Sequence, residues 1–128
     1  MGRLPHGGDL LETLTELCIR HDVRLGRVEA IGAVSRARVG YYDQTKHEYR
    51  CLELDRPLEI LSLIGNVSLR DGRPMVHAHI TLGDDQGHAF GGHLAPGTIV
   101  FACECTLQAF EGPPLERKPD ATTGLMLW

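Results

Sequence analysis

The chain has 128 residues, of which 42% are hydrophobic and 23% are charged, and these values are ordinary for one globular domain with a single core. Asp and Glu outnumber Lys and Arg by 17 to 13, which gives a net charge of −4 and argues against nucleic-acid binding by charge neutralisation. The N-terminal residues lack the apolar core of a signal peptide, and no apolar run approaches the about 20 residues of a membrane helix. We therefore expect a cytoplasmic protein that does not enter a membrane.

One helix is predicted near the N-terminus, from Asp9 to His21. Its apolar residues recur at helical spacing and form one stripe, which consists of Leu10, Leu11, Leu14, Leu17 and Cys18. Asp9 and Glu12 resemble a capping box, because an acidic N-cap is followed three residues later by Glu. The sequence thus predicts an amphipathic helix that covers a hydrophobic surface.

Beyond the helix the hydrophobic period changes to two, and short β-branched or alternating runs are separated by Gly, Asp and Asn. This pattern predicts seven strands: Arg27–Val34, Ala37–Tyr42, Glu48–Leu54, Leu58–Leu69, Met75–Leu82, His88–Leu94 and Thr98–Phe110. We therefore predict an α+β fold, a single domain over residues 1–128 with one twisted antiparallel sheet of about seven strands and the N-terminal helix packed on it. Residues 111–128 lack periodicity and are expected to lie extended over the surface.

Three histidines are the strongest indication of chemistry. His77 and His79 are two residues apart on one predicted strand, so both side chains point to the same face. A hairpin turn centred on Asp85 would set His93 opposite His77, and a turn centred on Gln86 would set it opposite His79. Either register brings the three imidazoles together.

Three neutral imidazoles with an open fourth position are typical of a catalytic zinc site. We therefore predict that His77, His79 and His93 bind zinc or another divalent transition metal ion. Gly91 and Gly92 precede His93, which indicates either a β-bulge or a close approach of two backbones.

Glu104 is the remaining candidate for a role in chemistry. Strand alternation places Phe101, Cys103 and Cys105 on one face and Glu104 on the other. If the face of Glu104 adjoins the histidines, this carboxylate is a candidate catalytic residue, acting as a general base or as a partner of a metal ligand. Exposure to solvent is the alternative interpretation.

The motifs resemble those of a known family, the PPC (plants and prokaryotes conserved) domain. The resemblance rests on the run Pro57–Leu69, on His77-Ala78-His79, on Gly91-Gly92-His93-Leu94 and on the strand of Glu104. It implies an α+β domain that assembles as a homotrimer. In plants, such domains follow a DNA-binding AT-hook and mediate association with other proteins. Here Gly72-Arg73-Pro74 matches the hook's central tripeptide, but Asp71 precedes it and basic flanks are missing.

A more distant resemblance is to acetolactate decarboxylase, in which three similarly spaced histidines hold zinc with the help of an arginine and a glutamate. Only His77, His79 and His93 match that arrangement, and none of the candidates Arg36, Arg38 and Arg70 can be assigned as the arginine. Three functions are therefore weighed. The first is a trimeric metal-binding protein that binds a small ligand or a partner protein, and the second is a metal-dependent, lyase-like enzyme acting on a keto or hydroxy acid. The third, direct DNA binding, is disfavoured by the net charge of −4.

Overall fold

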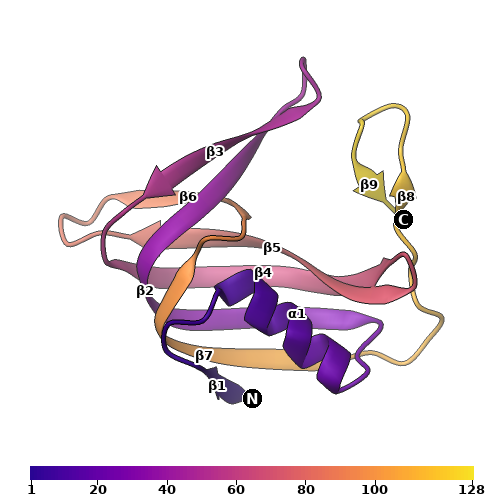
Figure 1. Cartoon of the computed structure of the whole chain (residues 1–128), viewed down its shortest axis with the longest axis horizontal. Coiled ribbons are helices and arrows are strands. Elements are labelled where there is room, and N and C mark those ends of the chain that lie inside the picture. Colours follow the sequence, from indigo (N-terminus) through magenta and orange to yellow (C-terminus); the bar gives the residue numbers. More distant parts are fainter.

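The computed structural model describes residues 1–128 and has one α-helix and a large antiparallel sheet, so the prediction of an α+β fold is confirmed (Figure 1). The helix is α1 (Leu10–Arg20). The strands of the main sheet are β1 (Gly2–Leu4), β2 (Gly26–Asp43), β3 (Glu48–Leu54), β4 (Leu58–Arg70), β5 (Arg73–Gly83), β6 (Ala89–Leu94) and β7 (Ile99–Ala109). A separate two-stranded sheet consists of β8 (Lys118–Pro119) and β9 (Met126–Leu127).

Helix α1 begins and ends where the sequence predicts. The N-cap residue Asp9 accepts a hydrogen bond from the backbone N–H of Glu12 at 3.0 Å, and His21 is the C-cap. The buried side of the helix consists of Leu10, Leu14 and Cys18, which pack into the core between the helix and the sheet. The apolar stripe thus fixes which side of the helix faces the sheet.

The sheet runs in the order β1-β7-β2-β4-β5-β6, and β3 pairs with β2. Strand β2 is one continuous strand of 18 residues, whereas the sequence predicts two strands with a break after Val34. The pairing of β2 with β7 instead shifts register at Val34 and again before Arg36. The interruption of the pattern is therefore a pair of irregularities within one strand, and it is not a turn.

The second half of β2 also pairs with β6, where Gly40 lies opposite His93. Strands β2, β4, β5 and β6 consequently form a closed circuit. Glycine is required at this closure, because a Cβ atom on Gly92 would lie 2.6 Å from the carbonyl oxygen of Gly40. Of the two interpretations of Gly91-Gly92, close approach is correct, since β5 and β6 pair without a register shift.

The irregularities around Val34 also change the alternation in β7. Val100 and Cys103 are both buried, and Phe101, which strict alternation places beside Cys103, is exposed. The prediction that Phe101 shares the face of Cys103 was therefore wrong. The predicted placement of Glu104 on the face opposite Cys103 and Cys105 is confirmed, because Glu104 is exposed and lies between these two buried residues.

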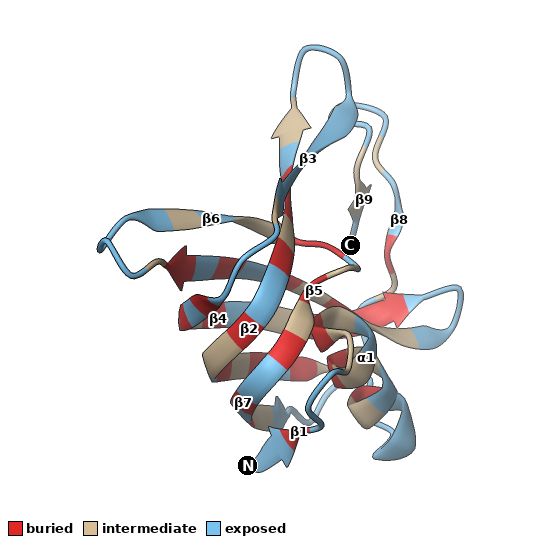
Figure 2. Cartoon of the chain, turned by 60° about the vertical axis from the view of Figure 1, so that its left-hand side comes forward, coloured by how far each residue is buried: buried red, intermediate tan, exposed pale blue.

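One face of the sheet packs on α1, and we call the opposite face the outer face. Several large apolar side chains are exposed on the outer face, among them Ile31, Leu61 and Ile64 (Figure 2 shows the exposure along each strand). They line part of a hollow of about 680 Å³ that also includes Glu104. No helix of the chain is long and apolar enough to cross a lipid bilayer.

The C-terminal residues are more ordered than the sequence predicts. The backbone of Leu69 on β4 bonds to Leu115 and Arg117, and β8 then pairs with β9. This segment therefore docks on the same chain, and Figure 1 shows its hairpin beside the arm formed by β3 and the end of β2.

The packing of α1 can be tested with Leu14→Ala. Leu14 is 1% exposed, so truncation removes buried apolar area and leaves a cavity. We expect the free energy of unfolding to fall by about 3 kcal/mol in urea denaturation. The control is Ile19→Ala on the solvent side of the same helix, where the side chain is 52% exposed and a change within about 0.5 kcal/mol is expected. Equal effects of the two substitutions would contradict the assigned buried side.

Candidate metal centre

The three predicted histidines come together on the outer face of the sheet. His79 on β5 lies directly opposite His93 on β6, which is the register of a turn centred on Gln86. The carboxylate of Asp84 fixes this turn by accepting hydrogen bonds from the backbone N–H groups of Gln86 and His88. The local turn chemistry thus selects one of the two registers that the sequence left open.

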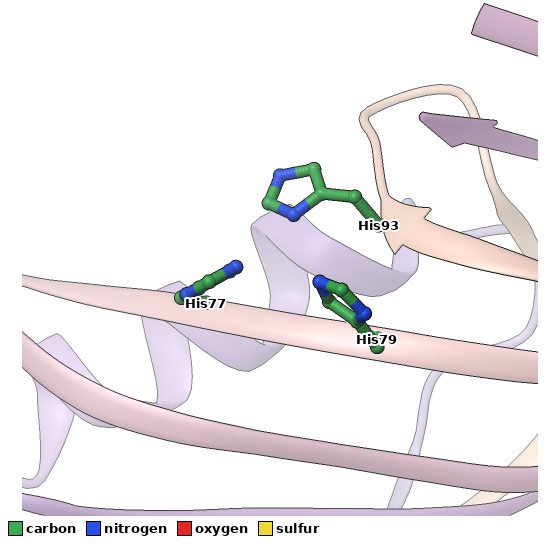
Figure 3. A group of neighbouring side chains, drawn as sticks. All are labelled: His77, His79 and His93. Atoms are coloured by element: carbon green, nitrogen blue, oxygen red, sulfur yellow. The ribbon is translucent and has the colours of Figure 1, made fainter. Parts of the chain in front are cut away.

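The side chains of His77, His79 and His93 point toward one another (Figure 3). One ring nitrogen from each lies within 4.8 Å of the corresponding nitrogens of the other two. The ring centroids are 4.9 to 5.6 Å apart. These separations suit three ligands around one small cation, which contacts imidazole nitrogens at about 2.0 to 2.1 Å when it is zinc.

Two observations indicate that the histidines suit a metal ion better than hydrogen bonding among themselves. The Nδ1 atom of His93 is buried and has no hydrogen-bond partner, although an unsatisfied buried nitrogen is costly. Burial and the charges of His93, Arg117 and His79 lower the pKa of His77 to about 4, and burial and the charges of His79 and Arg117 lower the pKa of His93. Both rings therefore remain neutral at physiological pH, which is the form that binds metal.

A residue that the sequence did not indicate, Arg117, joins the histidines. Its Nη2 atom lies 3.4 Å from His77 Nδ1 and donates a hydrogen bond of 2.8 Å to the side-chain oxygen of Asn66, which is opposite His77 on β4. Its Nε atom donates to Ser68 Oγ at 2.8 Å, and the ring of Trp128 lies 4.2 Å from the guanidinium carbon. The arginine of the site thus comes from the C-terminal segment, and not from Arg36, Arg38 or Arg70.

Tyr49 on β3 lies on the other side of the cluster. Its ring centroid is 5.0 Å from that of His93 and 5.0 Å from that of Tyr42. The hydroxyl of Tyr42 donates to the carbonyl oxygen of Thr123 at 2.7 Å, so the arm of β2 and β3 is joined to the C-terminal segment. The site is therefore bounded by three parts of the chain that are distant in sequence.

Glu104 is not in this group of side chains. It pairs with Ile31 of β2, and two strands, β2 and β4, separate its strand β7 from β5. Three strand spacings amount to about 14 Å, which exceeds the reach of a glutamate side chain. A role for Glu104 at these histidines would require a second copy of the chain to bring it there.

Comparisons with known proteins agree with the motifs. The sequence model of the Plants and Prokaryotes Conserved (PCC) domain matches residues 1–111. The chain belongs to this family. The match ends before Arg117, so the PPC domain as the family model describes it does not include the segment that carries the arginine.

Among solved structures, a metal-containing protein from Archaeoglobus fulgidus is 46% identical, with a TM-score of 0.95 over 99% of this chain and 89% of the other. A PPC protein from Pyrococcus horikoshii is 41% identical, with a TM-score of 0.94 over 99% and 87%. A structure from Ralstonia eutropha, described as that of a candidate DNA-binding protein, is 27% identical, with a TM-score of 0.88 over 98% and 86%.

Among curated proteins, the bifunctional protein GlmU of a Synechococcus strain is 35% identical over 126 residues, which is 97% of this chain. The chain spans only 19% of the length of that relative. A PPC domain therefore also occurs as a part of a much longer protein.

The pKa of His77 predicts how the stability of the metal-free protein depends on pH. In the unfolded chain the imidazole of His77 titrates near pH 6.5, so between pH 6.5 and 4 the unfolded chain binds a proton that folded His77 does not. The contribution of neutral His77 to the free energy of unfolding is complete above pH 6.5 and is lost as the pH falls from 6.5 to 4. From pH 7 to 4.5 we expect wild type to lose about 2 kcal/mol more than His77→Gln in urea unfolding. Equal losses in the two proteins would contradict the lowered pKa.

Proposed function

We propose that this PPC protein binds one divalent transition metal ion per chain, with His77, His79 and His93 as the ligands and zinc as the first candidate. The proposal rests on the convergence of one ring nitrogen from each of the three histidines within 4.8 Å, and on the buried Nδ1 of His93, which has no hydrogen-bond partner. The Archaeoglobus protein, described as metal-containing, supports the proposal at 46% identity. Nitrogen ligands of this kind also accept copper, nickel or iron, so metal analysis must identify the ion.

Three protein ligands leave a coordination position open, and a metal with such a position polarises a bound ligand as a Lewis acid. The role that we propose is therefore ligand binding at the metal. The residues of the chain provide the setting: Arg117 beside His77 supplies positive charge, and Tyr49 covers His93 on the side of the β3 arm. The Ralstonia structure is described as that of a candidate DNA-binding protein. For this chain, the net charge of −4 does not favour direct DNA binding.

We further propose that the protein assembles as a homotrimer through the outer face of the sheet. Ile31, Leu61 and Ile64 are each more than half exposed there, and a contiguous apolar surface of this kind usually marks an interaction site. Cyclic symmetry would cover the surface in every copy. Such an arrangement would also bring side chains of one copy, including Glu104, toward its neighbour.

The metal proposal predicts the behaviour of single histidine variants. After purification without a nickel column, we expect elemental analysis to find about one metal ion per chain in wild type. His77→Ala, His79→Ala and His93→Ala should each lower the affinity for zinc by at least about tenfold, because each removes one of three ligands.

The matched control is His21→Ala, since His21 is a histidine at the end of α1, outside the cluster. It should keep the metal content of wild type. Zinc binding that is equally strong in wild type and in His79→Ala would refute the assigned ligands.

The trimer is tested by placing a charge on the outer face. Ile64 is 61% exposed in the single chain, so Ile64→Glu should leave each chain folded but should break the assembly, because a buried unpaired carboxylate is costly. Light scattering coupled to size exclusion should report a trimer for wild type and a monomer for the variant. Ile19→Glu on α1 is the control and should remain trimeric. A wild type that is monomeric at micromolar concentration would refute the proposal.

A further inference from the structure

Arg117 is a buried charge that has no opposite charge beside it. The residue is only 5% exposed, and its hydrogen bonds go to neutral acceptors: Ser68 Oγ, Asn66 Oδ1 and the carbonyl oxygen of Met126, each at 2.8 Å. None of the ion pairs of the chain includes this guanidinium. Buried arginines are usually paired with a carboxylate, because an uncompensated charge in the interior is strongly destabilising.

No Asp or Glu carboxylate is among the groups whose charges affect Arg117, His77 or His93. The groups whose charges affect His77 and His93 are Arg117 and the other histidines, and the group that affects Arg117 is Tyr49. A divalent metal held by neutral histidines would add two positive charges to the charge of Arg117. Like charges repel strongly in a partly buried site. A bound anion would be needed to balance the charges of the metal and of Arg117, and the chain itself supplies none there.

The three histidines and Arg117 lie on the same side of the sheet, since Asn66 and Ser68, which bind Arg117, share the face of the histidines. A guanidinium has five N–H donors, and the hydrogen bonds to Ser68, Met126 and Asn66 leave one N–H at Nη1 and one at Nη2. The Nη2 atom lies 3.4 Å from His77 Nδ1, but a neutral imidazole that binds a metal through one nitrogen carries its proton on the other and has no acceptor for this N–H. Trp128 covers a face of the guanidinium, so a ligand approaches it at its edge. A carboxylate accepts charge-assisted hydrogen bonds from the two remaining N–H groups of such a guanidinium.

We propose that Arg117 makes this site selective for an anion, and that the ligand bound together with the divalent metal is a small organic carboxylate. This inference rests on the metal binding proposed above. It assigns a role to the C-terminal segment, which lies outside the family match over residues 1–111. It also has an unusual consequence, because Arg117 should weaken the binding of the metal alone and strengthen the binding of metal and carboxylate together.

Cobalt(II) is the probe, because its visible absorption reports both its own binding and a change of ligand. Metal-free protein is titrated first with Co²⁺ and then with acetate or pyruvate, and acetamide serves as the neutral control. In wild type we expect acetate, but not acetamide, to change the Co²⁺ spectrum with saturation. In Arg117→Met the affinity for Co²⁺ should be equal or higher, and the affinity for acetate should fall by at least about tenfold.

Two further variants make the experiment decisive. Arg117→Lys keeps the charge and should retain acetate binding within about threefold of wild type, even if Arg117→Met folds poorly. Arg70→Met removes an exposed arginine at the end of β4, half of whose side chain is accessible, and should behave as wild type in both titrations.

Each result has a separate meaning. Failure of wild type to bind Co²⁺ would refute the metal site itself. Co²⁺ binding without any response to acetate or pyruvate would overturn the carboxylate proposal alone, and so would joint loss of Co²⁺ and acetate affinity in Arg117→Lys, since Arg117 would then only position His77. A response to acetate that appears only in Glu104→Gln would assign the carboxylate to a neighbouring copy and would overturn the small-molecule ligand.

Discussion

The junction of β5, β6 and the second half of β2 is the constraint on which the candidate site depends. His93 has two partners there, His79 on β5 and Gly40 on β2, so its side chain is fixed from both sides of β6. The junction forms only because Gly92 lets two backbones approach more closely than a side chain would permit. It also brings the β3 arm, with Tyr49, against the histidine ring. The register of β5 and β6, the closure of the strand circuit and the arrangement of the three histidines therefore have one common cause.

Much of the site follows from local sequence rules. The spacing of His77 and His79 places both on one face of a strand, and the turn around Asp85 and Gln86 allows only two registers that bring His93 near them. The choice between the registers depends on the side chain of Asp84, which bonds two backbone N–H groups of the turn. Such side-chain capping is local, but the sequence does not show in which of several turns it will form.

The features that sequence reasoning missed are those that depend on distant contacts. Arg117 lies in a segment with three prolines and no periodicity, and only the docking of this segment on Leu69 brings it to the histidines. The continuity of β2 was missed because residues around Val34 break the alternation, and that break is absorbed by shifts in pairing with β7. The same shifts expose Phe101. Alternation predicts the face of a residue only while the register is constant.

The chain order of these parts has a consequence for folding. The three histidines belong to one hairpin and lie within a stretch of 17 residues, whereas Arg117 comes from a segment that docks across the sheet. Contacts between residues close in sequence carry a smaller entropic cost of loop closure and tend to form earlier than distant ones. The histidine cluster can therefore form before the C-terminal segment arrives. Under the proposed metal binding, a cation that entered at this stage would meet the imidazoles alone, and the positive guanidinium would then close over a site that is already filled.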